Sequence, residues 1–430
     1  MTITSLDGLI SGMSTSQVIS QLMQVEAQQQ TGLKQKVKDQ GTVIGALQSV
    51  NGKVSTLKAA ADKLILPGTW QAAKAASTSD SVTATARPGA ATGLWTFDVN
   101  ALATAQSSTA VVPATGSIML DPAAGVQITI GGTTTQIDVA TDTAQGVVDA
   151  INKKGIGINA SLVNTLQGTV LQVASTKTGA DNTFSVDGIN GSFNNISEAA
   201  NAEIGVGADL PGGYSVQNAS NSFDNVIPNV TLNVSKMQKG VTVATQNDAG
   251  SVADAMQAMI DAANGALSEV DTQGQYATAD GSQKAGPLAA NFTVTSMSGD
   301  ILSAVSGGMA DFGSFKQIGV ELTKDGQLTF DRNAFLAAYN SDPTKVRDAV
   351  TTGLAKSLSA FGDKAGQNVT SAIQNGTDTV KMLNGQISDW DVQLSMRQQT
   401  LQKQFSDMEV SLGKLKDQQS WLAGQIAQLG

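Results

Sequence analysis

The stretch 380–430, VKMLNGQISDWDVQLSMRQQTLQKQFSDMEVSLGKLKDQQSWLAGQIAQLG, decides the architecture of this chain of 430 residues. Its apolar side chains recur in steps of three, four and seven, which places them on one face of an α-helix. They are Val380, Leu383, Ile387, Trp390, Leu394, Leu401, Phe405, Met408, Leu412, Leu415, Leu422, Ile426 and Leu429. A helix of about 50 residues rises roughly 75 Å, too long to be buried in one compact domain, so it needs helical partners.

The amino-terminal end carries a matching signal. Apolar residues from Val18 to Leu66 again follow helical spacing, with Ser14 or Thr15 as a suitable N-cap and Pro67-Gly68 as a stop signal. Two such helices predict an antiparallel pair, either as an intramolecular hairpin alone or with neighbouring copies as further partners. The Gln-rich stretch 24–40 has a thin apolar stripe, which favours additional helices.

Composition excludes several classes of function. The chain has no histidine and no cysteine, and only 14% of its residues are charged. Imidazole bases, thiol nucleophiles, disulfides and ordinary zinc sites are therefore removed, and we expect neither catalysis nor a metal or other cofactor. A formal charge of −10 argues against a nucleic-acid partner.

The amino-terminal stretch 5–26, SLDGLISGMSTSQVISQLMQVE, is apolar but is interrupted by glycine, serine and Asp7. The first basic residue is Lys34, so the positively charged start of a Sec-type signal peptide is missing. We therefore expect neither a cleaved signal of this type nor insertion into a membrane.

Between the helical ends, the sequence predicts nested β-rich segments. Alternating runs occupy 81–108 and 212–248, and between them lies a unit at 126–187 with a hairpin at Gly131-Gly132, a short helix capped near Thr141 to Thr143, and closing strands. After residue 248 the sequence predicts a helix capped by Ser251, a loop-helix segment at 286–308, and a hairpin with an Asp-Gly turn followed by two short helices. The fold class is multidomain α+β.

Motifs that could carry chemistry have simpler interpretations. GIGINA (155–160) matches a dinucleotide fingerprint by letters, but it follows a predicted helix and enters a strand, the reverse of the required order. Asp181, Asp187 and Asn190 lack the spacing of a calcium loop and are interpreted as turn residues. Three other aspartates have local roles as turn, cap or pre-proline residues: Asp325, Asp331 and Asp342.

Three stretches carry a resemblance to a known family. They are SLDGLISGMSTSQVISQLMQVE (5–26), AASTSDSVTATARPGAATGLWTFDVNALATAQ (75–106), and GPLAANFTV with QIGVELTKDGQLTFDRNAFLAAYNSDPTKV (286–346). Together they resemble the flagellar filament cap family, hook-associated protein 2. DTAQGVVDAINKKGIGINASLVN (142–164) is similar to the repeat inserted in flagellins, and GPLAAN departs from the family pattern, which has Gly-Asp after Leu-Ala.

The resemblance implies a secreted structural protein at the distal tip of the bacterial flagellum. Its copies would assemble into a ring that promotes folding and insertion of exported flagellin. It implies homo-oligomer contacts, contacts with flagellin and other hook-associated proteins, and a type III export chaperone, while host glycans are a further candidate partner. The uncleaved amino-terminal segment would serve type III export.

The implied domains are nested. Residues 1–42 and 385–430 form a coiled-coil leg, 43–72 and 248–384 a helical α+β middle domain, 73–111 and 217–247 a β-rich head, and 112–216 a nested β-rich insert. The expected contacts with other copies or the filament are apolar leg positions. They are Leu9, Ile10, Val18, Leu22, Val25, Leu383, Ile387, Trp390, Leu394, Leu401, Phe405, Met408, Leu412, Leu415 and Leu422. Trp390 and Trp421 are interpreted first as helix-packing anchors.

Two alternatives remain at this point. Within the flagellum, a hook-filament junction or flagellin-like protein would form an adaptor ring or an open lattice. From another class, the Thr- and Asn-rich β region could serve a surface adhesin that binds mucin-type glycans.

Overall fold

The computed structural model describes residues 12, 14–113, 120, 125–189, 191–207 and 210–429. The chain divides into two compact units, 1–65 with 255–430, and 66–254. The expected leg residues Leu9 and Ile10, and the expected turn residue Asn190, lie outside the described residues.

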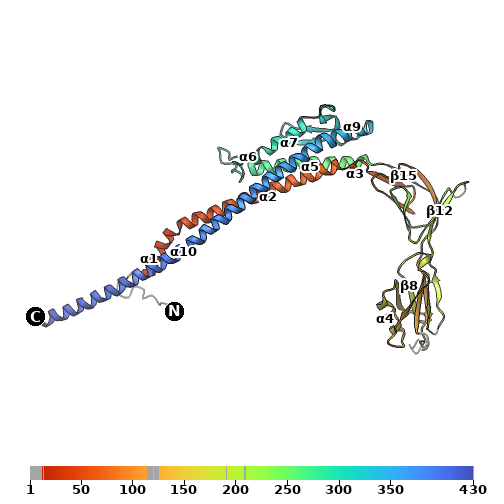
Figure 1. The fold of residues 1–430 in the computed structure, drawn as a ribbon, viewed down its shortest axis with the longest axis horizontal. Coiled ribbons are helices and arrows are strands. Elements are labelled where there is room, and N and C mark those ends of the chain that lie inside the picture. The colour runs from red at the N-terminus through yellow and green to blue at the C-terminus, as the bar shows by residue number, and fades with distance from the viewer. Residues whose placement is uncertain are drawn as a thin grey trace. The chain divides into compact units, whose positions relative to one another are not determined.

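The first unit is built on a long antiparallel helix pair. Helices α1 (Thr15–Glu26) and α2 (Gln28–Ile65) are separated at Ala27, and both lie along α10 (Ala355–Leu429). Figure 1 shows α10 continuing beyond α1. Helix α10 begins at Ala355 rather than at Val380, because glycines in its first part serve close packing instead of ending the helix. A Cβ atom on Gly362 would lie 2.6 Å from Cβ of Lys58 on α2.

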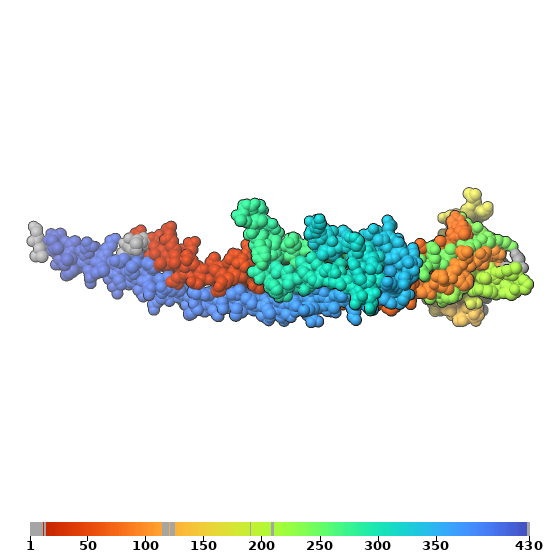
Figure 2. All heavy atoms as spheres, turned by 90° about the horizontal axis from the view of Figure 1, so that it is seen from above, coloured from red at the N-terminus to blue at the C-terminus, as the bar shows by residue number. Residues whose placement is uncertain are grey.

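Smaller elements pack on this pair and complete the first unit. They are α5 (Ala249–Gly274), α6 (Phe292–Thr295), α7 (Met297–Ser306), η2 (Phe315–Ile318), β16 (Val320–Leu322), β17 (Leu328–Phe330), α8 (Arg332–Ser341), α9 (Pro343–Asp348) and the π-turn η3 (Ala349–Leu354). Val50 and Val54 of α2, Val270 of α5 and Val369 of α10 meet in the core. In Figure 2, the loop between α5 and α6 projects from this unit (green).

Most of these elements begin and end at turn and cap residues that can be recognised in the sequence. Gly326 adopts the left-handed conformation (φ 74°) that the Asp-Gly turn requires. Asp331 accepts the first free amides of α8, as predicted for a cap position, and Asp342, interpreted from the sequence as a pre-proline residue, also accepts the amide of Lys345 at the start of α9. The expected cap of α5 was wrong by three residues: Asp248, not Ser251, accepts a hydrogen bond at this end, from the amide of Ser251 at 3.2 Å.

The second unit begins with the short helix α3 (Pro67–Trp70), where Pro67 starts a helical turn after the stop it imposes on α2. Two sheets follow, in the orders β1-β15-β3-β11-β12 and β13-β14-β2. Their strands are β1 (Ala73–Ser77), β2 (Val82–Ala86), β3 (Gly93–Ala101), β11 (Ala202–Val206), β12 (Tyr214–Asn218), β13 (Ser222–Ile227), β14 (Val230–Val234) and β15 (Gln238–Asn247). Phe97, Ile204, Phe223 and Leu232 are buried between the sheets. We call this part the head.

The insert is a second sandwich within the same unit. Its sheets have the orders β10-β4-β8-β7 and β6-β5-β9, with α4 against β7. The elements are β4 (Ser107–Val111), β5 (Val126–Ile130), β6 (Thr133–Ile137), α4 (Ala144–Lys154), β7 (Ile158–Thr165), β8 (Gly168–Ser175), η1 (Ala180–Asn182), β9 (Phe184–Asp187) and β10 (Asn194–Ser197). Ile128, Ile151, Leu171 and Val173 are buried in its core. Thr143 caps α4 as predicted.

Strand pairing shifts the expected ends of the insert. β4 was expected in the head, yet it pairs with β8 and β10 of the insert. β11 was expected in the insert, and β12 largely so, yet β11 pairs with β3 and β12 with β11 in the head. Alternation along a strand reports which residues face a core, but it does not say which strand lies beside it. The wider division into leg, middle domain, head and insert stays a prediction.

Candidate functional site

The chemistry-bearing motifs have structural explanations. Gly155 ends α4 in the left-handed conformation and β7 begins at Ile158, so GIGINA joins a helix to a strand and has no dinucleotide geometry. Within the described residues, no group of three or more acidic side chains could hold a metal ion, and no helix has the length and apolar character needed to cross a bilayer.

The shifted carboxyl groups serve the fold rather than acid–base chemistry. Hydroxyl and amide donors of Thr278 and Ser282 lower the pKa of Asp280 to about 2. Three side chains, led by Gln217, lower the pKa of Glu203. Both shifts stabilise the ionised carboxylate, whereas a general acid at neutral pH needs a raised pKa.

The candidate site is therefore the helix pair of the leg. α1 packs on α10, and Ile19 of α1 and Leu401 of α10 are both buried, each 7% exposed. In the first turn of α2, the side chain of Gln30 is buried and its Nε2 donates to Oδ1 of Asp391 at 2.5 Å. Nε of Arg397 lies 2.9 Å from Oε1 of Glu26. These contacts fix the antiparallel register of the pair.

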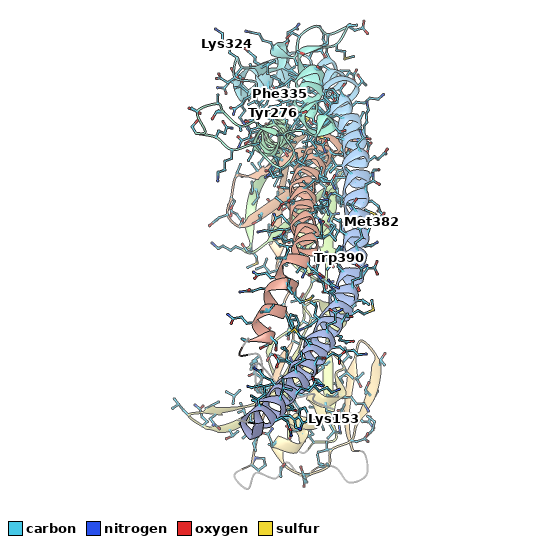
Figure 3. The ribbon with its side chains drawn as sticks, turned by 90° about the vertical axis from the view of Figure 1, so that its left-hand side faces the viewer. Lys153, Tyr276, Lys324, Phe335, Met382 and Trp390 are labelled. Carbon is cyan, nitrogen blue, oxygen red and sulfur yellow. The ribbon has the colours of Figure 1, made fainter. Side chains whose placement is uncertain are left out.

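The structure divides the expected contact residues into three groups. Leu383 and Leu401 are buried, while Val18, Ile387, Trp390, Leu394, Phe405, Met408 and Leu412 are half-buried. Leu22, Val25, Leu415 and Leu422 are exposed. The half-buried Trp390 and the exposed Met382 are labelled on α10 in Figure 3. Most of the α10 positions thus face the chain's own amino-terminal helices, whereas Leu22 and Val25 of α1 do not.

Sequence reasoning missed the buried polar members of this interface. Thr15, Gln30 and Glu409 are 5 to 6% exposed, and Ile19 rather than Val18 is the buried apolar residue of α1. Thr15, Ile19, Glu26 and Gln30 follow steps of four and seven, so they lie on one helical face. A search for periodicity that admitted polar residues would have found them.

The last part of α10 has a different environment. We call residues 410–427 the α10 tail; it lies beyond the part of α10 that pairs with α1. Large apolar side chains are exposed along it: Val410 54%, Leu415 60%, Trp421 66%, Leu422 54% and Ile426 64%. Leu415, Leu422 and Ile426 continue the face that Leu401 uses upstream. This apolar face is the best candidate for contact with other subunits.

A long helix pair with an apolar tail, joined in sequence to nested β-sandwiches, defines a structural protein that acts by assembly. The family models of flagellar hook-associated protein 2 match the chain, the amino-terminal model over 11–106 and the carboxyl-terminal model over 199–417. The chain belongs to the flagellar hook-associated protein 2 family. The predicted family, the multidomain α+β fold class and the assignment to the filament cap of the bacterial flagellum are thereby confirmed.

Individual relatives agree over most of their length. The A-type flagellar hook-associated protein 2 of Pseudomonas aeruginosa is 25% identical, with 99% of this chain and 98% of the relative covered. The lateral flagellar hook-associated protein 2 of Vibrio parahaemolyticus is also 25% identical, over 73% of this chain and 74% of the relative. The crystal structure of the D1-D2-D3 domains of the flagellar cap protein FliD from Escherichia coli matches 77% of this chain and 99% of that chain. Its TM-score is 0.59 at 20% identity, which shows a shared fold.

Proposed function

We propose that copies of this chain cap the flagellar filament as a closed ring and attach to their surroundings through the α10 tail. The observation that carries this proposal is the change in exposure along one helical face. Leu401 is 7% exposed where α1 covers it, whereas Leu415 and Ile426 are 60% and 64% exposed in the tail. An apolar stripe of this length in water is stabilised when another helix covers it.

The same face serves successive partners in the proposal. In the assembled cap it contacts flagellin at the filament end, neighbouring copies or other hook-associated proteins. Before export a type III chaperone covers it, since an exposed Trp421 and Leu422 would otherwise promote aggregation. The ring holds each incoming flagellin while it folds. No catalytic step enters this function.

Host glycans remain a prediction for the head. Among the described head residues, Tyr214 is the one exposed aromatic side chain, at 54%, whereas Trp95 is half-buried and donates its indole N–H to the hydroxyl of Thr245 at 3.3 Å. The geometry therefore supports attachment through the helical tail better than adhesion through the β-rich region.

The proposal is tested by replacing Leu415, Leu422 and Ile426 with serine in the flagellated cell. These side chains are exposed in the single chain, so the variant should keep its own stability and lose its contacts with other subunits. Each residue would contribute roughly 1.5 to 3 kcal/mol when fully buried in the cap, so even half-burial makes the loss measurable. We expect unpolymerised flagellin in the medium, short filaments and poor swimming.

The matched control replaces Met382, Val392 and Met396 with serine. These side chains are 55 to 57% exposed on the same helix but lie upstream of the tail. The control should cap normally. The assay also measures the variant itself in the medium, which separates failed capping from failed export. Normal filaments with an exported tail variant would contradict the proposal.

A further inference from the structure

The insert has an outer strand that is unusually open to strand addition. β7 (Ile158–Thr165, INASLVNT) is the last strand of the sheet β10-β4-β8-β7. It has eight residues, no charge and no proline, and its register with β8 is continuous. Proteins usually protect such edges with lysine, proline or a bulge, because unpaired backbone groups recruit other strands. The opposite edge, β10, has four residues and a register shift between Asn195 and Ser197.

A side chain of α4 occupies the edge of β7 instead. Nδ2 of Asn152 donates to the carbonyl of Ala160 at 2.9 Å, and the amide of Ala160 donates to Oδ1 of Asn152 at 2.8 Å. The carboxamide thus forms the same two hydrogen bonds that a neighbouring strand would form with this residue.

The pairing pattern shows that these backbone groups face outward. The amide of Thr176 donates to the carbonyl of Gly157 at 2.9 Å, so Ile158 and Ser175 between them form a non-hydrogen-bonded pair. Hydrogen-bonded and non-hydrogen-bonded pairs alternate along an antiparallel ladder, so Ala160 and Val173 are also non-hydrogen-bonded. The amide and carbonyl of Ala160 therefore point away from β8, toward the position of an added strand.

Among the described residues, the same arrangement is found at three other places. Each time one carboxamide binds both the amide and the carbonyl of a single residue at a strand or beside one. Gln106 binds Phe184 at the start of β9, with both distances 2.8 Å; Asn264 binds Leu328 of β17 at 2.7 and 2.8 Å; Asn221 binds Ala103 at 2.7 and 3.0 Å. A chain poor in charge thus completes the backbone hydrogen bonding at these strand positions with side-chain amides.

We propose that Asn152 is an edge guard that prevents β7 from pairing with β7 of a second copy. Unlike the other three positions, this guard protects a long, uncharged strand whose remaining outward groups, at Leu162 and Asn164, could extend a ladder at once. The partner that Asn152 excludes is β7 of a second copy, because β7 can pair with itself in the antiparallel direction. When Ser161 of one copy lies opposite Val163 of the other, these residues of both copies are on the same face of the joined sheet. In a protein that works at high local concentration of copies, the guard restricts association to the intended contacts.

The test uses the full chain, which has no native cysteine. Ser161→Cys and Val163→Cys, prepared separately and mixed, report β7–β7 pairing as an inter-copy disulfide, since cross-strand neighbours have the required Cβ separation. With Asn152 present we expect little cross-linking. Asn152→Ala should raise the cross-linked fraction about tenfold. This factor corresponds to losing a hydrogen bond of ordinary strength between Asn152 and Ala160. Asn159→Ala, the same change on the outer face of β7, should leave it unchanged.

Two further variants make the result decisive. Asn164→Lys in the Asn152→Ala background places a charge on the open edge and should return cross-linking to the starting level. Asn152→Asp keeps the acceptor for the amide of Ala160 but loses the donor, so it should be intermediate, and it decides the question if Asn152→Ala does not fold. Equal cross-linking of the Asn152 and Asn159 variants, or cross-linking that Asn164→Lys does not reverse, would overturn the proposal.

Discussion

Gln30 and Asp391 are joined across the helix pair of the leg by a 2.5 Å hydrogen bond, although they are 361 positions apart in the sequence. Gln30 is 5% exposed, and its other amide atom, Oε1, accepts from Nζ of Lys34 at 2.9 Å. A buried polar residue in an apolar seam fixes register more strongly than it adds stability, because any shift leaves it without a partner. The leg thus uses polar contacts where its apolar stripe is thin.

Replacement of Gln30 with alanine tests this role. We expect Gln30→Ala to lower the free energy of unfolding by about 1 kcal/mol, since the carboxylate of Asp391 can still bind water. Urea unfolding followed by circular dichroism measures the change. Gln29→Ala alters an exposed neighbour and should change stability by less than about 0.5 kcal/mol. Equal effects of the two variants would show that Gln30 has no special role.

The strand order predicts how the insert behaves as a fragment. Residues 112–216 omit β4, which lies between β10 and β8 in the insert sheet. We therefore expect that fragment to lack a cooperative thermal transition, whereas residues 103–201, which contain β4 and end before β11, should melt cooperatively. Calorimetry of the two fragments gives the answer. A cooperative transition in 112–216 would mean that β4 is dispensable for the insert core.

Local signals in the sequence were sufficient to predict most helices, strands and turns. They were insufficient to predict which elements pack against one another. The hairpin at Gly131-Gly132 and the cap at Thr143 depend on residues within a few positions, and both were predicted. The predicted carboxyl-terminal stripe began at Val380, whereas α10 begins at Ala355; Gly362 and Gly376 in the added part allow close approach to α2, which depends on a helix three hundred residues away. The buried Gln30 and the edge guard Asn152 were missed for the same reason. Their environment is set by the fold and not by their neighbours in sequence.

Acid should weaken the contact between α2 and α10 through Asp62. Hydrogen bonds from Lys58 and from Ser359 hold the pKa of Asp62 below its ordinary value of 3.8. A lowered folded-state pKa contributes stability that is complete above the unfolded value and is lost as pH falls through the folded value. We expect Asp62→Asn to cost up to about 1 kcal/mol near pH 6 and progressively less below pH 4, since the pair is partly exposed. Urea unfolding of both proteins between pH 2 and pH 6 measures the difference, and a constant difference across this range would contradict the assignment.

Serine substitutions in the part of α10 that pairs with α1 should destabilise the single chain, unlike substitutions in the α10 tail. Replacing Leu401 and Phe405 with serine removes one buried and one half-buried side chain from the part of α10 that pairs with α1. We expect a loss of several kcal/mol in the stability of the leg, since each large apolar side chain contributes about 1.5 to 3 kcal/mol when fully buried. In cells this variant should also release flagellin into the medium. Protease digestion of the purified chain should cut the leg first; unchanged digestion would show that α1 does not depend on this face.

The last prediction concerns order at the two ends of the leg. In the dilute single chain, the apolar stripe of 24–40 is thin, and the α10 tail exposes its apolar face to water. We expect the amides of 412–427 to exchange hydrogen rapidly at low concentration and to become protected on assembly, because covering Leu415, Leu422 and Ile426 then stabilises the helix. The first eleven residues lie outside the described part of the chain, and the same experiment reports on them.

Hydrogen exchange with mass spectrometry at low and high concentration makes this comparison. The amides around Val50 and Val54, whose side chains are 0 to 1% exposed in the core of the first unit, provide an internal control and should be protected in both conditions. Arg397 marks the boundary, because its ion pair with Glu26 holds the upstream part of α10 against α1. Exchange should therefore slow on assembly mainly beyond Leu412. Strong protection of 412–427 in a verified monomer would show that the tail is ordered before any partner covers it.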